Sequence, residues 1–247
     1  MQALVLTALF FLIAGNAVAQ EPKALTVKTI ATIQKSVVPV VCLGLNSDNQ
    51  VFRKATLGTG FLINRNGQFL TAGHVARGIF SIPADQCTPA IYLNKQSWRD
   101  RSVTLDAKWF KIEKCSWNNE IDIGVCRTID NPFSDALVNK NIAPVVLDSF
   151  LKYPDGTPVA FTAFPLQSLI PITSQANIAA YDVNAKKLII DKTSWEGASG
   201  SPLYSGDGKV IAIMTEAGTD KSAGFAMARP VELAITYLRE QKIPFEK

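Results

Sequence analysis

The segment GTGFLINRNGQFLTAGHV, residues 58–75, predicts a β-hairpin in the first third of the chain. Its two halves are short and apolar, and between them lies Asn-Arg-Asn-Gly at residues 64–67. An Asn-Gly pair supplies the positive φ angles that a tight hairpin requires. The segment therefore favours a fold of short antiparallel strands.

Apolar stretches of the same kind recur on both sides of a polar segment at residues 130–141, with a second hairpin turn at residues 205–208. Many short strands separated by turn residues are typical of barrels and sandwiches. Residues 27–35 and 230–241 favour helices instead. In the second helix, Pro suits the first helical position and an apolar stripe follows it. We expect no appended binding domain, such as a PDZ domain, after this helix.

The composition fits one folded unit or two small units that share an interface. Of 247 residues, 47% are hydrophobic and 19% are charged, and the 25 basic and 21 acidic residues are spread along the chain. No run of Lys or Arg is long enough to follow a phosphate backbone. We therefore expect no nucleic-acid partner, and the sequence leaves the oligomeric state open.

The first residues, MQALVLTALFFLIAGNAVAQ, predict a signal peptide at residues 1–19. An apolar run precedes Ala17 and Ala19, small residues at the two positions that a signal peptidase reads. No Lys or Arg precedes this run, which departs from the usual pattern. The run is shorter than the ~20 residues of a membrane-spanning helix, so an anchor is only the alternative. The protein is predicted to be secreted or periplasmic.

Export would place the cysteines in an oxidising compartment, where an even set predicts disulfides. The four residues Cys42, Cys87, Cys115 and Cys126 allow three pairings, and free buried thiols are the alternative. Cys115 and Cys126 flank an Asn-Asn turn and can face each other across a hairpin. With one histidine and no CxxC pair, the chain offers no zinc site, and we expect no metal or other cofactor.

A candidate nucleophile lies in residues 194–202, SWEGASGSP. Glycines on both sides of Ser199 allow a tight turn that exposes the hydroxyl and points amide N–H groups into one small space. Such a space can hold an oxyanion. A structural turn of small residues is an equal alternative when this segment is taken alone.

Serine needs a base within hydrogen-bond reach, and His74 is the only histidine in the chain. It lies at the end of an apolar strand where the chain turns. A neutral imidazole acting as base needs an acceptor for its other nitrogen, and Asp122 fits best. Because Asp122 lies between apolar neighbours in a predicted strand, it needs a partner to offset its desolvation. The alternatives are a structural role for His74 and a cap or turn role for Asp122.

Together these segments resemble the chymotrypsin-like, or trypsin-like, serine peptidases, especially the bacterial branch that includes the HtrA and glutamyl endopeptidase proteins. The three matching motifs are Thr-Ala-Gly-His at 71–74, Asp-Ile-Gly-Val at 122–125 and Gly-Ala-Ser-Gly-Ser-Pro at 197–202. Further similarity is found at residues 58–62, 156–165 and 224–226. The order His, Asp, Ser agrees with this family and excludes an α/β-hydrolase, in which the histidine follows the serine.

The resemblance implies an all-β fold of two packed Greek-key β-barrels of chymotrypsin type with a C-terminal α-helix. Residues 20–135 would form the first barrel, with His74 and Asp122. Residues 136–247 would form the second barrel, with Ser199, and the helix. It further implies a serine endopeptidase that acts on a protein or peptide through an acyl-enzyme, with the amides of Gly197 and Ser199 as the oxyanion hole. The alternative is an inactive secreted protein of the same fold that binds peptides or acts as a chaperone.

By the family register, the substrate-binding residues would be Thr193 at the base of the primary pocket and, along its walls, Met214, Thr215, Ala217 and Ala226. No acid lies at the pocket base, which argues against cleavage after Arg or Lys and favours a small or medium apolar residue. Glu216 would attract basic residues to neighbouring subsites. Ser201 replaces a commoner Gly, no cysteine follows His74, and no activation junction is evident.

Overall fold

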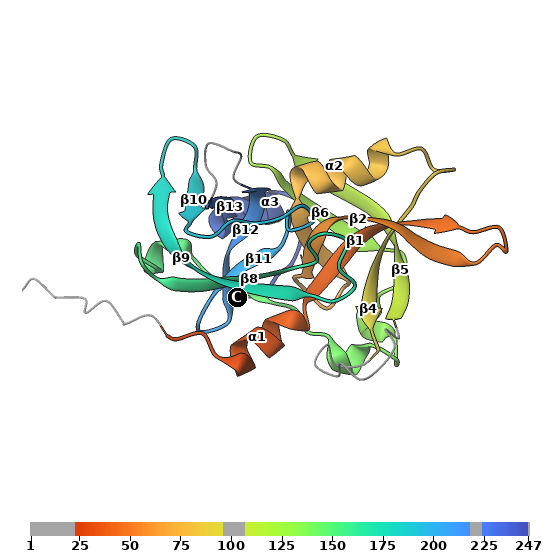
Figure 1. The fold of residues 1–247 in the computed structure, drawn as a ribbon, viewed down its shortest axis with the longest axis horizontal. Coiled ribbons are helices and arrows are strands. Elements are labelled where there is room, and N and C mark those ends of the chain that lie inside the picture. The colour runs from red at the N-terminus through yellow and green to blue at the C-terminus, as the bar shows by residue number, and fades with distance from the viewer. Residues whose placement is uncertain (1–22, 96–106, 218–223, 247) are drawn as a thin grey trace, which may run out of the picture.

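The computed structural model describes residues 23–95, 107–217 and 224–246. The predicted signal peptide lies outside these residues. Figure 1 shows two halves rich in β-strands lying side by side, one built from β1–β6 with α2 and the other from β8–β13 with α3. The predicted all-β fold of two packed barrels is confirmed.

The first barrel is closed and antiparallel, with the strand order β1-β2-β3-β6-β5-β4. Its strands are β1 (Val37–Leu45), β2 (Val51–Leu62), β3 (Gln68–Ala72), β4 (Thr88–Asn94), β5 (Ala107–Asn118) and β6 (Ile123–Thr128). The predicted hairpin is formed by β2 and β3, and Gly67 in its turn has a φ of +76°. Because β3 pairs with β6 in antiparallel fashion, the residues just after β3 lie beside the residues just before β6.

The second barrel has the order β11-β8-β9-β10-β13-β12 and is closed by pairing of β11 with β12. Its strands are β8 (Pro158–Ala163), β9 (Ile172–Asp182), β10 (Lys187–Ile190), β11 (Pro202–Ser205), β12 (Lys209–Ala217) and β13 (Ala226–Pro230), and β7 (Val146–Leu147) adds in parallel to β12. The predicted turn at residues 205–208 joins β11 to β12, with Gly208 at a φ of +78°.

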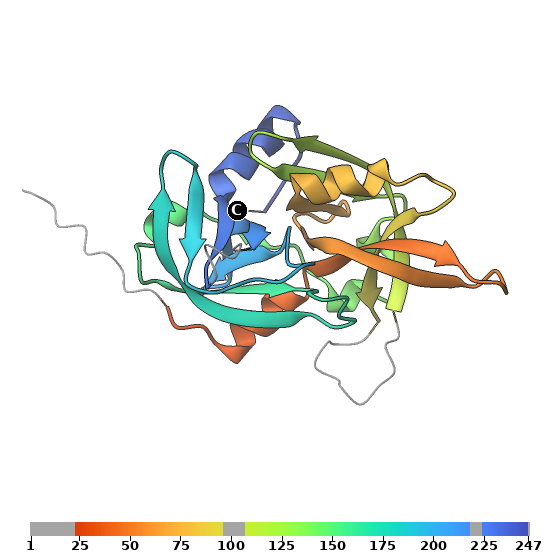
Figure 2. The same ribbon diagram turned by 45° about the horizontal axis from the view of Figure 1, so that its top comes forward.

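Both predicted helices are present, as α1 (Val27–Gln34) and α3 (Val231–Glu240). Pro230 is the N-cap of α3 and not its first helical residue. The segment between the barrels contains the 3-10 helices η1 (Pro132–Ser134) and η2 (Asn139–Asn141), and η3 (Phe150–Lys152) follows β7. Figure 2 shows α3 beside the second barrel, with the chain end returning between the two halves. In the described part of the chain, every helix is too short or too polar to span a bilayer.

The helix α2 (Gly73–Ser81), which begins at the end of β3, was not predicted. Its glycines at positions 73 and 78 lower the helix propensity of a short segment. The apolar spacing of a helix was nevertheless present in the sequence, because Val75, Ala76 and Ile79 are spaced to lie on one helix face. All three are buried. This helix changes the setting of His74, which lies in its first turn.

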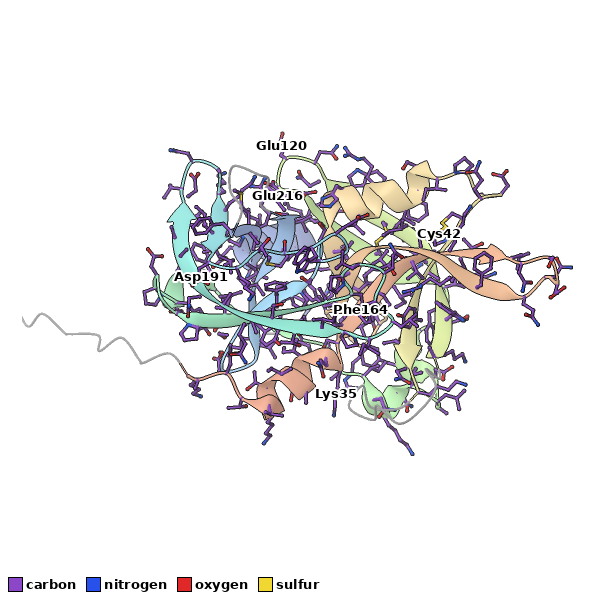
Figure 3. All side chains as sticks on the ribbon, in the orientation of Figure 1. Lys35, Cys42, Glu120, Phe164, Asp191 and Glu216 are labelled. Atoms are coloured by element: carbon purple, nitrogen blue, oxygen red, sulfur yellow. A yellow bond between two sulfur atoms is a disulfide. The ribbon has the colours of Figure 1, made fainter. Side chains whose placement is uncertain are left out.

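One apolar cluster joins the two barrels. It includes Phe61 and Tyr92 from the first barrel and Phe164 and Ile213 from the second. Figure 3 labels Phe164 where the two halves meet, and its ring makes an edge contact with Tyr92 at a centroid distance of 5.9 Å. This shared core holds the two barrels, and with them α2 after β3 and the loops after β8 and β10, in one arrangement.

Two disulfides are formed, Cys42–Cys87 and Cys115–Cys126, so the alternative of free thiols is wrong. Cys115 and Cys126 are cross-strand partners in the β5–β6 hairpin, as the sequence predicted. The Cys42–Cys87 bond closes a segment that contains β2, β3 and α2. It therefore restrains the part of the chain that carries His74.

The two disulfides should differ in their contribution to stability. In the loop-entropy account, a bond that closes a 45-residue separation contributes about 4 kcal/mol and one that closes 11 residues about 3 kcal/mol. The double variant Cys42→Ser/Cys87→Ser is thus expected to lose more free energy of unfolding than Cys115→Ser/Cys126→Ser. Urea denaturation measures both losses. Equal stability of the parent and the first variant would contradict this prediction.

Candidate active site

His74 is positioned by the junction of β3 and α2. Ala72, the last residue of β3, pairs with Ile123 at the start of β6, so the turn that precedes β6 lies against the first turn of α2. Asp122 is the last residue of that turn, with a φ of +51°. The predicted placement of Asp122 within a strand is therefore wrong, because β6 begins one residue later.

Asp122 binds the start of α2 in two ways. Its main-chain oxygen accepts from Gly73 N at 2.9 Å, and its carboxylate Oδ1 accepts from His74 N at 2.8 Å. Ala72, the N-cap of α2, makes no capping bond with its side chain. Asp122 therefore satisfies amide groups that a helix start leaves without partners, which is the capping alternative.

The same carboxylate also holds the imidazole. Its Oδ2 lies 2.9 Å from His74 Nδ1. The His74 side chain is 40% exposed and that of Asp122 is 20% exposed, so the acid is the more shielded partner. A carboxylate at Nδ1 favours the neutral tautomer with its proton there, which leaves a lone pair on Nε2. Asp122 thus both caps α2 and contacts the His74 imidazole.

The turn that carries Ser199 is tied to the first barrel by Thr59 of β2. Thr59 N donates to Ser199 O at 2.8 Å, and Thr59 Oγ1 donates to Gly197 O at 2.7 Å. Thr59 is fully buried, and the sequence assigned it no role although it lies in the Gly-Thr-Gly match to the family. Because β2 pairs with β3, these bonds hold Ser199 beside the strand that leads to His74.

The hydroxyl of Ser199 donates to Thr215 O at 3.3 Å. Among the described residues this hydroxyl makes no hydrogen bond to His74. The amides of Gly197 and Ser199 have no acceptor in the described part of the chain, whereas Ala198 N and Gly200 N donate to Trp195 O and Met214 O. The turn therefore leaves two amides available to a substrate oxygen.

Gly200 is required by the contact between the barrels. Its φ is +87°, and a Cβ there would lie 2.1 Å from Thr59 O and 2.2 Å from Thr71 Oγ1. We expect Gly200→Ala to lower the free energy of unfolding by about 2–4 kcal/mol, since backbone and buried threonine must move. Gly156→Ala is the matched control, because its φ is +84° and nothing lies within 4 Å of its Cβ position. Urea denaturation that shows equal losses would contradict the steric argument.

The residues expected to bind substrate lie around this turn. Thr193 precedes the Ser199 turn and is partly exposed. Ala226 pairs with Ala217 at one end of the β12–β13 strand pair. The Met214 side chain belongs to the core of the second barrel, and its backbone N and O are bonded to Ser201 O and Gly200 N. Thr215 supplies the carbonyl that holds the Ser199 hydroxyl.

The expected attraction of basic substrates to Glu216 is not supported. Its carboxylate lies 2.6 Å from Lys187 Nζ, so its charge is already paired. Ser201 is fully buried and lacks a positive φ, so this position accepts a side chain where the family commonly has Gly.

Two closed β-barrels with this arrangement at their junction define the chymotrypsin-like class of proteins. A family model for the trypsin-like peptidase domain matches residues 58–213. The chain therefore belongs to the trypsin-like peptidase family of serine endopeptidases. No curated protein matches it.

Among solved structures, the chain is similar in fold to an HtrA-type protease, AlgW with decapeptide, at a TM-score of 0.63 and 15% sequence identity. The similarity covers 86% of this chain and 66% of that one. The chain thus spans just under two thirds of the length of this neighbour, and the described residues show two barrels and no further domain.

Proposed function

We propose that the protein is a secreted serine endopeptidase in which Ser199 is the nucleophile, His74 the general base and Asp122 the orienting carboxylate. The observation that carries the proposal is the 2.9 Å contact of Asp122 Oδ2 with His74 Nδ1, beside a serine turn that Thr59 ties to the same barrel. Membership of the trypsin-like peptidase family supports it.

In the first step, the Ser199 hydroxyl turns from Thr215 O to His74 Nε2. It then attacks a peptide carbonyl while His74 takes its proton, and the amides of Gly197 and Ser199 hold the oxyanion. Protonated His74 next gives the proton to the leaving amine. A water molecule, deprotonated by the same histidine, then attacks the acyl carbon. The ester bond to Ser199 Oγ breaks as His74 returns the proton to that oxygen. Asp122 itself takes up no proton in either step, and its carboxylate stabilises the charged imidazole.

Export is part of the proposal. Two disulfides form and persist most readily in an oxidising compartment, which supports a secreted or periplasmic protein with a cleaved leader at residues 1–19. The substrate proposed is a protein or peptide with a small or medium apolar residue at the cleaved bond. The absence of an acid at Thr193 and the pairing of Glu216 with Lys187 support this preference.

Digestion of a peptide library tests the function. Residues 20–247 are incubated with the library, and mass spectrometry identifies the new termini. We expect cleavage after small or medium apolar residues and none after Arg or Lys.

A protein that binds peptides without cleaving them is a second candidate. The bond from Ser199 Oγ to Thr215 O, in place of one to His74, favours it. Retention of library peptides with no new termini would support this candidate and contradict the peptidase.

A further inference from the structure

The chain makes an unusual turn after β8. Leu166 and Gln167 have φ values of +51° and +61°, and Ser168 N donates to Pro165 O at 2.9 Å across them. Two successive non-glycine residues in the left-handed region are strained, and such a conformation persists only where its surroundings hold it. We refer to residues 165–168 as the left-handed turn.

The contacts that hold this turn come from β2 of the first barrel. The Gln167 side chain pairs in both directions with the backbone of Thr56, accepting from Thr56 N at 2.6 Å and donating to Thr56 O at 3.1 Å. The Arg53 guanidinium donates to Gln167 O at 2.8 Å and to Ser168 O at 3.0 Å. One cation thus binds two carbonyls at the end of the left-handed turn, those of Gln167 and Ser168.

A third contact comes from β4. Tyr92 Oη donates to Leu169 O at 2.9 Å, one residue beyond the turn. Burial raises the pKa of Tyr92 to about 12, although the nearby charge of Arg53 opposes this, so the hydroxyl remains a donor at any ordinary pH. Two strands of the first barrel therefore bind one loop of the second.

When the left-handed turn is held in position, it orients the peptide between Glu196 and Gly197, whose N–H belongs to the proposed oxyanion hole. Leu166 N donates to Glu196 O at 2.8 Å. In a planar trans peptide the C=O and N–H groups point in opposite directions, so a Glu196 oxygen held at the turn directs Gly197 N–H away from it. Gly197 also packs directly on this segment, since a Cβ there would lie 2.6 Å from Phe164 O.

We propose that Arg53 and Gln167 are positioning residues that fix the direction of the Gly197 amide through the left-handed turn. The inference rests on the proposed function, because it concerns the donor that would bind the oxyanion. Without these contacts the strained turn relaxes, Leu166 N withdraws from Glu196 O, and the peptide between Glu196 and Gly197 rotates. The transition state then loses a hydrogen bond that the bound substrate does not need.

The test uses Gln167→Ala and Arg53→Lys in the mature chain. Loss of one oriented oxyanion donor lowers kcat by ~10²-fold. We expect such a fall in kcat with KM within about threefold of the parent value, because ground-state binding is unchanged. Leu166→Asn, which places a residue tolerant of positive φ in the turn, should recover part of the kcat lost in Gln167→Ala.

The controls are matched in residue type. Gln34→Ala removes a side-chain bond to Thr173 Oγ1, and Arg229→Lys alters a guanidinium that donates to Ala185 O beside Lys186, another residue with positive φ. Both controls should retain the parent kcat. Thermal unfolding of every variant shows which of them fold.

Hydrogen exchange of the Leu166 amide, followed by NMR, decides the inference independently of turnover. We expect faster exchange in Gln167→Ala and Arg53→Lys than in the two controls. A parent chain without peptidase activity would refute the proposed function, while the exchange rates still report on the turn. Folded Gln167→Ala and Arg53→Lys variants with the parent exchange rate, or with the parent kcat, would overturn the positioning role.

Discussion

Replacing Ser199 by alanine is expected to lower kcat/KM for a peptide substrate by ~10⁴-fold or more. The fold should remain intact, because the hydroxyl makes one hydrogen bond, a 3.3 Å contact with Thr215 O, whose loss costs about 1 kcal/mol. Steady-state kinetics and thermal unfolding of the purified variant measure the two effects. A large loss of activity with no more than this small loss of stability would assign the nucleophile.

Ser201→Ala is the matched control for this variant. Ser201 lies two residues along the same turn, and its buried hydroxyl has no hydrogen-bond partner among the described residues. Its removal should leave both activity and stability near the parent values. Near-normal turnover by Ser199→Ala, or an equal loss in Ser201→Ala, would contradict the assignment.

Asp122→Asn should lower kcat by ~10³- to 10⁴-fold. The asparagine oxygen can still accept from His74 N, so the start of α2 keeps its cap. Its NH₂ group takes the place of Oδ2, however, and donates to the imidazole where the carboxylate accepted. His74 Nδ1 then becomes the acceptor and Nε2 carries the proton, so the histidine is the wrong tautomer to act as base.

Asp130→Asn and Asp122→Ala complete this comparison. Asp130 is an exposed carboxylate beyond the other end of β6, and its replacement should change neither kcat nor stability. Asp122→Ala removes the cap as well and should lose about 1 kcal/mol of free energy of unfolding that Asp122→Asn retains. Unchanged kcat in Asp122→Asn would refute the role of the carboxylate at Nδ1.

Features set by neighbouring residues could be predicted from the sequence. The hairpin at residues 58–75 follows from its short apolar stretches and Asn-Gly turn, and Gly67 has the positive φ that the turn requires. The disulfide between Cys115 and Cys126 follows from the hairpin between them. The side chains of His74 and Asp122, chosen for their chemistry, do lie in contact.

Features set by packing between distant segments could not be predicted. The helix α2 forms although its glycines disfavour it, because its apolar face packs on the first barrel. Asp122 lies in a turn with positive φ because its backbone and side chain both bind the start of α2. The contacts of Arg53 with residues 167 and 168 join chain segments more than a hundred residues apart, and no local sequence pattern predicts them.

Reaction with a fluorophosphonate probe is the most direct test of the proposed site, because phosphonylation needs both an activated hydroxyl and an assembled oxyanion hole. The mature chain is treated alongside its His74→Ala variant, and mass spectrometry locates the adduct. We predict one adduct, on Ser199, in the parent chain and none in the variant. An unlabelled parent, or labelling of Ser199 that persists without His74, would contradict the triad of His74, Asp122 and Ser199.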